Sequence, residues 1–587
     1  MIQPPPPGPN ASIFMVEFCG TLILVAVAFC FPRLLSERFR QIERTFGRLA
    51  QRKTAMVVAV GLAAFFGRLA ILPICPIPLP FVPDDFSFLL SAETFAHGRL
   101  FNPTPAMWLH FETIHVTMQP SYTSMYFPGQ GLILAAGQVL FGHPWFGLLI
   151  VNALMCAAIC WMLQTWMPAS WALLGGVLSI VHLGLFSYWI NTYHAAGGIC
   201  ALGGALILGA LPRLMKTALF RYGVLLAIGI ALLVLTRPYE GLLLCLPVLA
   251  VLVRWALLSK SRLSGMVLMR RAALPLALIV AAGSWLAYYD YRAFGKPTTL
   301  PYTVDRAQYA MAPYYVWQPQ RPEPAYHHAA MRAFYHAGEL EFFTKIHSVK
   351  GFLPQTLLKF SWGIFFFTGF ALIPPLFLLP RAMKDRRMRL LVVCLAVMLA
   401  GMLIQIFLLP HYLAACTALF YALGLQAMRH MRHWKPEGKP VGLTMARLSV
   451  TFCLVLAGLR LGAQPLHLML NEWPATNWNF MWYGPGHYGV ERSRIEDELN
   501  HLPGEQLVLV RYSDKHNPFD EWVYNSAEIE NAKVLWAREM DGSKNDELVG
   551  YYKNRHVWLV EPDEGTVQLV PYRPPDLQSD RLIARNR

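Results

Sequence analysis

The sequence has few charged residues and no sign of a domain held together by disulfides or zinc. Only 14% of its 587 residues are charged, whereas 55% are hydrophobic. The ten cysteines all lie in or beside apolar runs and the polar C-terminal region has none, so we expect neither a disulfide framework nor a CxxC zinc site. The opening MIQPPPPGPN lacks the basic region of a signal peptide, and the apolar run after it is interpreted as a retained helix. This composition excludes an ordinary water-soluble domain and predicts an integral membrane protein.

The positive charge is dispersed along the chain. The net charge is +15, but Lys and Arg stand in short segments between apolar runs, which is typical of membrane topology and not of nucleic-acid binding. About twelve runs are long enough to cross a hydrocarbon core of about 30 Å. They lie near residues 13–32, 54–76, 145–166, 171–190, 196–212, 222–236, 241–258, 272–290, 352–379, 389–409, 412–428 and 441–462.

Alternate connections between these runs hold nearly all of the basic residues, and this sets the orientation. The connections 33–53, 213–221, 259–271, 381–389 and 429–439 hold 23 Lys and Arg, whereas the short connections of the opposite set hold only Arg237. Because basic loops resist translocation, we expect the basic set to be cytoplasmic. Both termini are then extracytoplasmic, as are the segments 77–144, 291–351 and 463–587.

This layout predicts three parts. Residues 1–53 form an extra N-terminal span with a basic cytoplasmic linker, 54–462 form the main transmembrane module, and 463–587 form an extracytoplasmic domain. In the first outer loop, a helix lying on the membrane surface is expected after PDDF, and YFPGQGLILAAGQVLFGHP is too short to span and reads as re-entrant or interfacial. The strand-like runs LVLV, KVLWA and HVWLV predict a small C-terminal α/β domain.

The paired carboxylates Asp84 and Asp85 are the first candidates for chemistry. They follow a transmembrane helix directly, in a part of the chain where acidic residues are otherwise scarce. A carboxylate at the membrane edge can accept a proton, but one Asp can equally cap the helix that begins near Phe86. Adjacent side chains point in different directions, so the two are expected to have separate roles, and the sequence does not choose between them.

The resemblance to a known family lies in this region. A transmembrane helix, then PDDF, an interfacial helix, the YFPGQG segment and further alternating helices resemble the C-type glycosyltransferase (GT-C) superfamily, with a branch like the protein O-mannosyltransferases and aminoarabinose transferases. The resemblance implies a sugar donor linked to a polyprenyl phosphate and an acidic residue of the first outer loop that acts on the acceptor, here Asp84 or Asp85. The span at 13–32 departs from the family pattern, because it precedes the helix that is first in the family.

A lipid-phosphate donor of this kind needs cations for the departing phosphate. The candidates at predicted outer helix ends are Arg237, Arg292, Lys296 and Lys350. Arg237 is the most suggestive, because its short loop has no other basic residue, although a side chain snorkelling to the headgroups is equally compatible. Arg68 lies within a span and needs a partner, for which lipid phosphate, Asp84 or Asp85, and a buried acid all remain open.

Histidines and aromatic residues provide further candidates. His97, His110, Glu112 and His115 are metal-ligand types in one outer loop, and some members of the superfamily bind a divalent ion. Their spacing is not HExxH, so a structural or acceptor-binding role is favoured over a metal site, and the cofactor stays unknown. His411 and Tyr412 begin a helix at the outer face and either meet the site from the other side or lie at headgroup level.

The sequence therefore predicts a multi-pass enzyme of the cytoplasmic (inner) membrane. It is expected to be a hexosyl- or pentosyltransferase that moves a sugar from a polyprenyl-phosphate donor to a lipid, glycan or protein acceptor at the outer face, with inversion and with an outer-loop Asp as base. Its partners are the donor, the acceptor and membrane lipids, with no nucleic acid. The alternative is a transporter or flippase of a lipid-linked sugar or another amphiphile, which usually places charges near the bilayer midplane, and Arg68 favours it.

Overall fold

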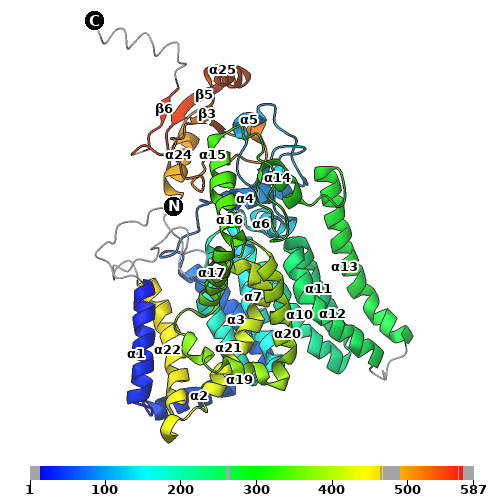
Figure 1. The fold of residues 1–587 in the computed structure, drawn as a ribbon, viewed down its shortest axis with the longest axis vertical. Coiled ribbons are helices and arrows are strands. Elements are labelled where there is room, and N and C mark those ends of the chain that lie inside the picture. Colours follow the sequence, from blue (N-terminus) through cyan, green and yellow to red (C-terminus); the bar gives the residue numbers. More distant parts are fainter. Residues whose placement is uncertain (1–12, 259–264, 463–465, 467–488, 566, 573–587) are drawn as a thin grey trace.

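The computed structural model describes residues 13–258, 265–462, 466, 489–565 and 567–572. A bundle of apolar helices carries a cap of loops, short helices and a small sheet at one end (Figure 1). Seven of the described helices are long and apolar enough to cross a membrane, and three shorter apolar helices accompany them. The prediction of a polytopic helical membrane protein with a small C-terminal α/β domain is confirmed.

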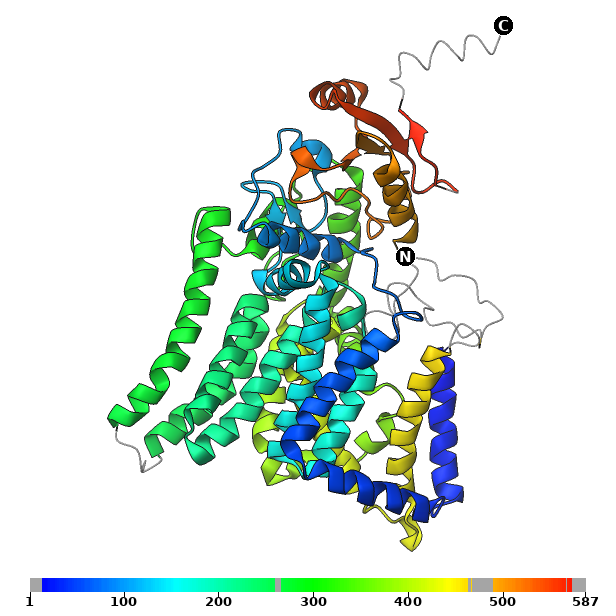
Figure 2. The ribbon, with the colours of Figure 1, turned by 180° about the vertical axis from the view of Figure 1, so that it is seen from behind.

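Every predicted span coincides with helical structure. The bundle helices are α1 (Ile13–Cys30), α3 (Lys53–Ala70), α7 (Trp145–Trp166), α8 (Ala169–Ser179), α10 (Gly197–Thr217), α11 (Phe220–Thr236), α12 (Pro238–Leu258), α13 (Gly265–Phe294), α17 (Val349–Thr368), α20 (Arg389–Ile404), α21 (Thr417–Met431) and α22 (Val441–Leu461). The extra helix α1 packs against α22, and α2 (Ser36–Ala50) joins it to α3 (Figure 2).

Three predicted spans are not continuous α-helices. The run 171–190 continues from α8 into the π-helix η1 (Ile180–Gly184) and the short helix α9 (Tyr188–Asn191). The run 352–379 breaks after α17 at Gly369, which has a φ of 54°, and 412–428 begins in the 3-10 helix η4 (Pro410–Cys416). Hydropathy does not sense these breaks, because the residues stay apolar while the backbone changes. The breaks matter because η4 and the segment after α9 both reach the cavity end of the bundle.

Helix α10 lies at the centre of the bundle, against α7, α11, α21 and η4. The close approach to η4 depends on Gly204, because a Cβ at this position would stand 1.8 Å from the backbone oxygen of Ala415. Small residues let membrane helices come this close, and van der Waals packing then holds them together. Gly204 therefore fixes the position of η4, which carries His411 and Tyr412.

The outer loops form the cap on the bundle. The first contains α4 (Pro83–Ala96), α5 (Trp108–Phe111), the hairpin strands β1 (Val116–Thr117) and β2 (Thr123–Ser124), and α6 (Pro128–Phe141). The second contains α14 (Pro301–Tyr309), α15 (Ala329–Arg332), the π-helix η2 (Ala333–Glu339) and α16 (Leu340–His347). Helix α6, predicted to be re-entrant or interfacial, packs against α4 above the bundle (Figure 1).

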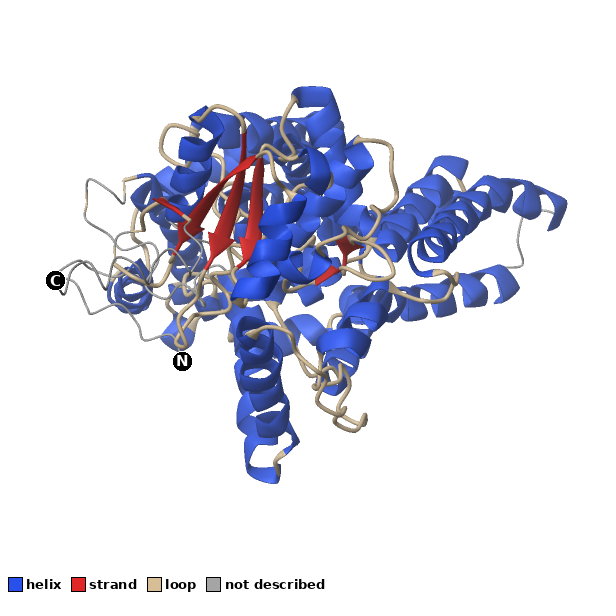
Figure 3. Ribbon diagram, turned by 90° about the horizontal axis from the view of Figure 1, so that it is seen from above, coloured by secondary structure: helices blue, strands red, loops and turns tan. Residues whose placement is uncertain are grey.

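The C-terminal domain is a four-stranded sheet with two helices. Its strands are β3 (Glu505–Val510), β4 (Val534–Arg538), β5 (Arg555–Val560) and β6 (Val570–Pro571), in the order β4-β3-β5-β6, and its helices are α24 (Val490–His501) and α25 (Gly542–Tyr551). Strand β3 is parallel to β4 and β5, whereas β6 is antiparallel to β5 (Figure 3). The central strand is buried from Gln506 onward, as expected for parallel strands between covering layers.

This domain docks firmly on the first outer loop. Tyr524 stacks on Phe86 of α4 with ring centroids 4.3 Å apart, and its hydroxyl donates to the backbone oxygen of Ile114 at 3.1 Å. Arg538 donates to the backbone oxygen of Glu112 at 2.7 Å, and its own backbone oxygen accepts from His110 at 3.0 Å. Apolar residues of both parts share one buried cluster. The domain is thus a fixed wall of the cap.

Replacing Gly204 by Ala should destabilise the protein, because the new methyl group would collide with the backbone of η4. Overpacking of this kind costs about 1–3 kcal/mol. The measurement is thermal unfolding of the full chain in detergent. The control is Gly424→Ala in α21, where nothing lies within 4 Å of the new Cβ. Equal melting temperatures for the two variants would contradict the proposed close contact.

Candidate functional site

A cavity of about 940 Å³ lies where the cap meets the bundle. Its walls come from three parts of the chain: the first and second outer loops, the cap ends of the bundle helices, and the C-terminal domain. The polar and charged residues that line it are Asp84, His115, Tyr126, Arg237, Tyr302, Arg306, Tyr314, Glu339, His411, Tyr412, Glu491, Arg492, Asn517 and Asp520. Aromatic and aliphatic side chains make up the remaining wall, so the cavity is amphipathic.

The first turn of α4 sends its two carboxylates in different directions. Pro83 occupies the first helical position, where its missing N–H costs nothing, and the two aspartates follow. The side chain of Asp84 is 31% exposed and lines the cavity, whereas that of Asp85 is fully buried. The sequence left open which one is placed for chemistry, and the structure places only Asp84 at the cavity.

Asp85 is a structural acceptor. Its Oδ1 accepts from the backbone N–H groups of Tyr193 and His194 at 2.8 and 2.9 Å and lies 2.8 Å from His194 Nδ1. Its Oδ2 accepts from the backbone N–H of Phe81 at 3.3 Å, just before the helix. The capping alternative therefore describes Asp85 in part, because this carboxylate fixes the helix entrance and ties α4 to the segment after α9.

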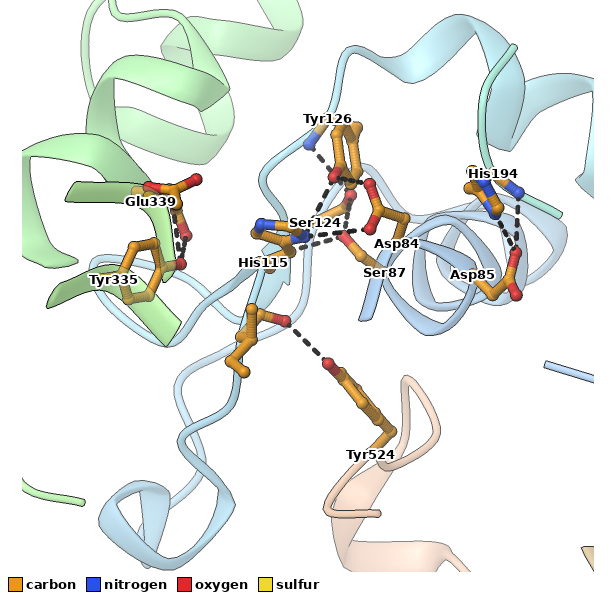
Figure 4. A network of polar contacts seen from close by, with 12 residues as sticks. Asp84, Asp85, Ser87, His115, Ser124, Tyr126, His194, Tyr335, Glu339 and Tyr524 are labelled. Carbon is orange, nitrogen blue, oxygen red and sulfur yellow. Dashed lines mark hydrogen bonds and ion pairs between the residues drawn. The ribbon is translucent and has the colours of Figure 1, made fainter. Parts of the chain in front are cut away.

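Asp84 belongs to a polar group with His115 and Tyr126 (Figure 4). The hydroxyl of Tyr126 donates to Asp84 Oδ1, and His115 Nδ1 lies 3.5 Å from Asp84 Oδ2. Tyr126 Oη and His115 Nδ1 are 3.1 Å apart, and the Tyr126 ring is stacked on Phe88 at 4.3 Å. His115 and Tyr126 are both buried, so they hold the Asp84 carboxylate in one orientation at the cavity wall.

The charge of Asp84 is stabilised by these partners. Burial alone would raise the pKa of Asp84, but the charge of His115 and the hydrogen bonds from His115 and Tyr126 outweigh it and hold this pKa well below its ordinary value. Burial lowers the pKa of His115, but the nearby carboxylates of Asp84, Asp305 and Glu339 raise it above its ordinary value overall. Asp84 is therefore a carboxylate, paired with a histidine that favours its cationic form.

The backbone of His115 is held in an uncommon conformation. Its φ is 62°, in the left-handed region that non-glycine residues seldom adopt. The Ser87 hydroxyl donates to the backbone oxygen of His115 at 2.7 Å and lies 2.7 Å from the hydroxyl of Ser124 (Figure 4). These buried serines compensate the strain and aim the imidazole at Asp84.

Two buried arginines line the same cavity. Arg237 donates from Nη1 to Glu240 Oε1 at 3.1 Å, and its guanidinium lies 4.4 Å from the centroid of the Tyr412 ring. Arg306 is paired with Glu339 at 2.7 Å, and its guanidinium lies 4.8 Å from the Tyr314 ring centroid. In both arginines the Nε is buried and has no hydrogen-bond partner among the described residues, so each retains a donor for an anionic ligand.

The other predicted phosphate-binding cations lie elsewhere. Arg292, Lys296 and Lys350 are exposed and do not line the cavity, and Arg292 contacts Tyr288 at 2.8 Å. Arg68 is fully buried but donates to the backbone oxygens of Cys75 and Pro76 at 2.9 and 3.2 Å and to Asn191 Oδ1 at 2.9 Å. Neither Asp84, Asp85 nor another acidic side chain occurs among these contacts, which join Arg68 to the turn after α3 and to Asn191.

The predicted cluster in the first outer loop is dispersed. His97 is exposed at the end of α4, His110 binds the C-terminal domain, and Glu112 accepts from Tyr309 and lies 3.0 Å from His327 Nδ1. Only His115 reaches the cavity, where His411 and Tyr412 also lie. His411 is buried and its Nδ1 lies 2.8 Å from the Tyr188 hydroxyl, so these two residues meet the site from the bundle side.

No group of three His, Cys, Asp or Glu side chains among the described residues is arranged to ligate a metal ion. Three of the four cavity carboxylates are paired with basic groups: Asp84 with His115, Glu339 with Arg306, and Glu491 with Arg494. Some members of the GT-C superfamily bind a divalent ion, but these side chains do not form a site that fits one. No step is therefore assigned to a metal.

Sequence reasoning missed Tyr126, Arg306 and His194. Tyr126 begins the YFPGQG segment and Arg306 lies in the aromatic segment PYTVDRAQY, so both were within reach as polar residues of the outer loops. Nothing in the local pattern, however, brings Arg306 to the same cavity as Asp84, since that depends on how two loops about 200 residues apart fold over one bundle end. His194 carries no signal beyond its place in a short outer connection.

Comparisons with known proteins give structural similarity only. No protein-family model matches the sequence, and no curated protein matches it. Among solved structures, the chain is similar to ArnT from Cupriavidus metallidurans in the apo state, with 17% identity, a TM-score of 0.45, and coverage of 88% of this chain and 94% of that chain.

Two archaeal structures are similar over nearly the same part of the chain. The oligosaccharyltransferase of Archaeoglobus fulgidus in the apo form has 12% identity, a TM-score of 0.43, and coverage of 86% of this chain and 69% of that one. The same organism's AglB, in complex with an inhibitory peptide and a dolichol-phosphate, has 13% identity, a TM-score of 0.41, and coverage of 87% and 69%. At these identities and TM-scores the similarity supports no functional assignment, and the function rests on the site itself.

The different settings of the two aspartates lead to a stability prediction. Asp85→Asn should lower the free energy of unfolding by about 2–4 kcal/mol, because an amide cannot accept from both the His194 and the Phe81 sides. Asp84→Asn should cost less than Asp85→Asn, since the Asp84 side chain is 31% exposed and an amide oxygen can still accept from Tyr126. Thermal unfolding of the full chain in detergent measures both, and a larger loss for Asp84→Asn would contradict the assignment.

Proposed function

We propose that the protein is a glycosyltransferase that moves a sugar from a polyprenyl-phosphate donor to an acceptor hydroxyl or amine at the outer face of the cytoplasmic membrane. The observation that carries this proposal is the arrangement of one amphipathic cavity at the end of the bundle. An oriented carboxylate, Asp84, lines it together with two buried arginines, Arg237 and Arg306. A base and an anion site within one cavity are what displacement of a lipid phosphate by an acceptor needs.

In this mechanism Asp84 is the general base. The acceptor oxygen or nitrogen attacks the anomeric carbon while its proton passes to the Asp84 carboxylate, and the bond to the phosphate oxygen breaks. A direct displacement of this kind inverts the configuration at the anomeric carbon. Tyr126 and His115 hold the carboxylate in place, and their hydrogen bonds together with the charge of His115 favour its ionised form before attack.

The two arginines stabilise the leaving phosphate. Negative charge grows on the departing oxygen, and fixed donors in a site partly shielded from water stabilise it strongly. Each guanidinium already has a carboxylate partner, Glu240 or Glu339, so an incoming phosphate would share the arginine and use its Nε–H. The partners also keep both side chains extended towards the cavity when no donor is bound.

The rest of the cavity suits an amphiphilic donor. Trp362 of α17 and Phe407 provide an apolar wall on the bundle side, where an isoprenoid chain would leave the membrane, and Phe342 of the cap helix α16 stacks on Phe407. Polar residues of the C-terminal domain, Asn517 and Asp520, lie on the opposite wall. The proposed path therefore has the lipid entering from the bundle and the acceptor entering beneath the C-terminal domain.

The orientation follows from the same proposal. The basic connections lie at the end of the bundle away from the cavity, so the positive-inside rule places the cavity, the α/β domain and both termini outside the cytoplasm. The membrane is proposed to be the inner membrane of a bacterium-like cell. The exposed position of Asp84 in a cap cavity, away from the bundle midplane, favours transfer over transport.

Asp84→Asn should abolish most sugar transfer, because the amide cannot accept the acceptor proton. Loss of a general base costs about 10²–10⁴ in rate. Membranes containing the full chain are given a panel of radiolabelled polyprenyl-phosphate sugars, and labelled product is counted. The matched control is Asp546→Asn, an exposed residue on α25 far from the cavity wall.

Two outcomes would contradict the proposal. Full activity of Asp84→Asn would mean that Asp84 is not the general base. Wild-type membranes that move the donor across the bilayer without consuming it would instead support a transporter.

His115→Gln should move the acid limb of the pH–rate profile to higher pH. The imidazolium lowers the pKa of Asp84, so its removal raises that pKa and protonates the base at a pH where the wild type still carries a carboxylate. Loss of an adjacent opposite charge predicts a shift of about 1–3 pH units. Initial transfer rates measured across the acid pH range test this shift. An unchanged acid limb would mean that His115 does not lower the pKa of the base.

A further inference from the structure

Asp305 is a buried carboxylate beside the proposed phosphate site. It directly precedes Arg306 in α14, and its side chain is fully buried, whereas Arg306 lines the cavity. Its two oxygens accept from the Tyr335 hydroxyl at 3.5 and 3.4 Å, which are long distances for a hydrogen bond to a carboxylate. Asp305 forms no ion pair with a described residue, so its charge is poorly compensated.

The charged and titratable groups that face Asp305 come from three elements of the cap. They are His115 directly before β1, Arg306 and Tyr309 of α14, and Tyr335 and Glu339 of η2. In Figure 4, His115 lies between Asp84 on one side and Tyr335 and Glu339 on the other. Burial raises the pKa of both tyrosines well above its ordinary value, so they stay neutral.

The carboxylates of this group outnumber its cations. With Asp84 beside His115, the group holds three carboxylates and two cations, so one negative charge is left over. Arg321 donates to the backbone oxygen of Arg306 at 2.5 Å, but it is half-buried and water screens its charge. A phosphodiester bound to Arg306 would add a second negative charge in a buried setting, where like charges repel strongly. An incoming proton removes this conflict.

Asp305 is the carboxylate best placed to take that proton. Asp84 is held in its ionised form by its hydrogen bonds, and Glu339 has the Arg306 guanidinium at 2.7 Å. Asp305 has no such partner. Burial raises the pKa of Asp305 to about 6, even though the charges of His115 and Arg306 lower it.

We propose that Asp305 takes up a proton when the donor phosphate binds Arg306, so that donor binding is coupled to protonation. The inference rests on the proposed function, because it takes a phosphodiester as the ligand of Arg306. The proton comes from water, the Asp305 carboxylate becomes a neutral carboxyl group, and the buried group gains no net charge. Asp305 is thus a positioning residue that makes room for the anion and touches no reacting atom.

The test is isothermal titration calorimetry of the purified full chain in detergent with farnesyl methyl phosphate. This isoprenoid phosphodiester carries a single charge that does not change near neutral pH. Titrations at neutral pH in Pipes and in Tris, which differ in ionisation enthalpy, count the protons taken up. Because a nearby charge moves a carboxyl pKa by about 1–3 pH units, the wild type should take up roughly half a proton or more per bound probe. Its affinity should weaken as pH rises through neutrality.

Two variants identify the group that takes up the proton. Asp305→Asn should bind the probe without proton uptake, because the amide keeps the shape of the carboxyl group and cannot titrate. Its affinity should also vary much less with pH than that of the wild type. The matched control is Asp520→Asn, which removes a carboxylate from the opposite cavity wall and should retain the uptake. The wild-type proton count and pH dependence stand by themselves if Asp305→Asn does not fold.

The outcomes separate this inference from the proposed function. Binding of the probe by the wild type without proton uptake would overturn the inference alone. Undiminished uptake in Asp305→Asn, or a loss confined to Asp520→Asn, would do the same. If the wild type did not bind the probe, the inference and the proposed function would both be contradicted.

Discussion

The buried carboxylate of Asp85 is the contact on which the cavity depends. It joins the start of α4 to the backbone of Tyr193 and His194, which are 108 and 109 residues away in the chain. Because Asp85 fixes that end of α4, the side chain of the preceding residue, Asp84, points into the cavity beside His115 and Tyr126. The adjacent aspartates thus have different roles: Asp85 is buried and hydrogen-bonded within the protein, whereas Asp84 remains accessible from the cavity.

The same fixed helix carries the C-terminal domain. Phe86, the residue directly after Asp85, stacks on Tyr524, and buried polar contacts around Arg538 join the sheet to the first outer loop. The segment that follows β3 therefore reaches the cavity as a wall of defined shape. The bundle brings the opposite wall through η4, whose approach to α10 requires the missing side chain of Gly204. Three distant parts of the chain consequently meet at one site.

Much of this architecture is readable from the sequence, because bilayer physics imposes long apolar runs and an asymmetry of basic loops. The bundle helices, the helices α4 and α6 of the first outer loop, and the strands β3, β4 and β5 lie where hydropathy and strand-like runs predict them, whereas β6 was not predicted. The breaks at η1 and η4 were not predicted, since the residues there remain apolar while the backbone departs from α-helix.

The site was only half predictable. Paired aspartates at a helix start and an isolated Arg237 stand out against an apolar background, and both belong to the assembled cavity region. Arg306 and Tyr126 carry no such contrast, because their loops are already polar and aromatic. A shared loop does not bring His97, His110 and Glu112 to the cavity with His115, because each is held by a different neighbour.

The most direct measurement is a cryo-electron microscopy structure of the full chain with a non-hydrolysable polyprenyl-phosphate sugar. The account predicts density in the cavity with the phosphate between Arg237 and Arg306 and the anomeric carbon facing Asp84. A phosphate bound away from both arginines, or a sugar turned away from Asp84, would contradict it.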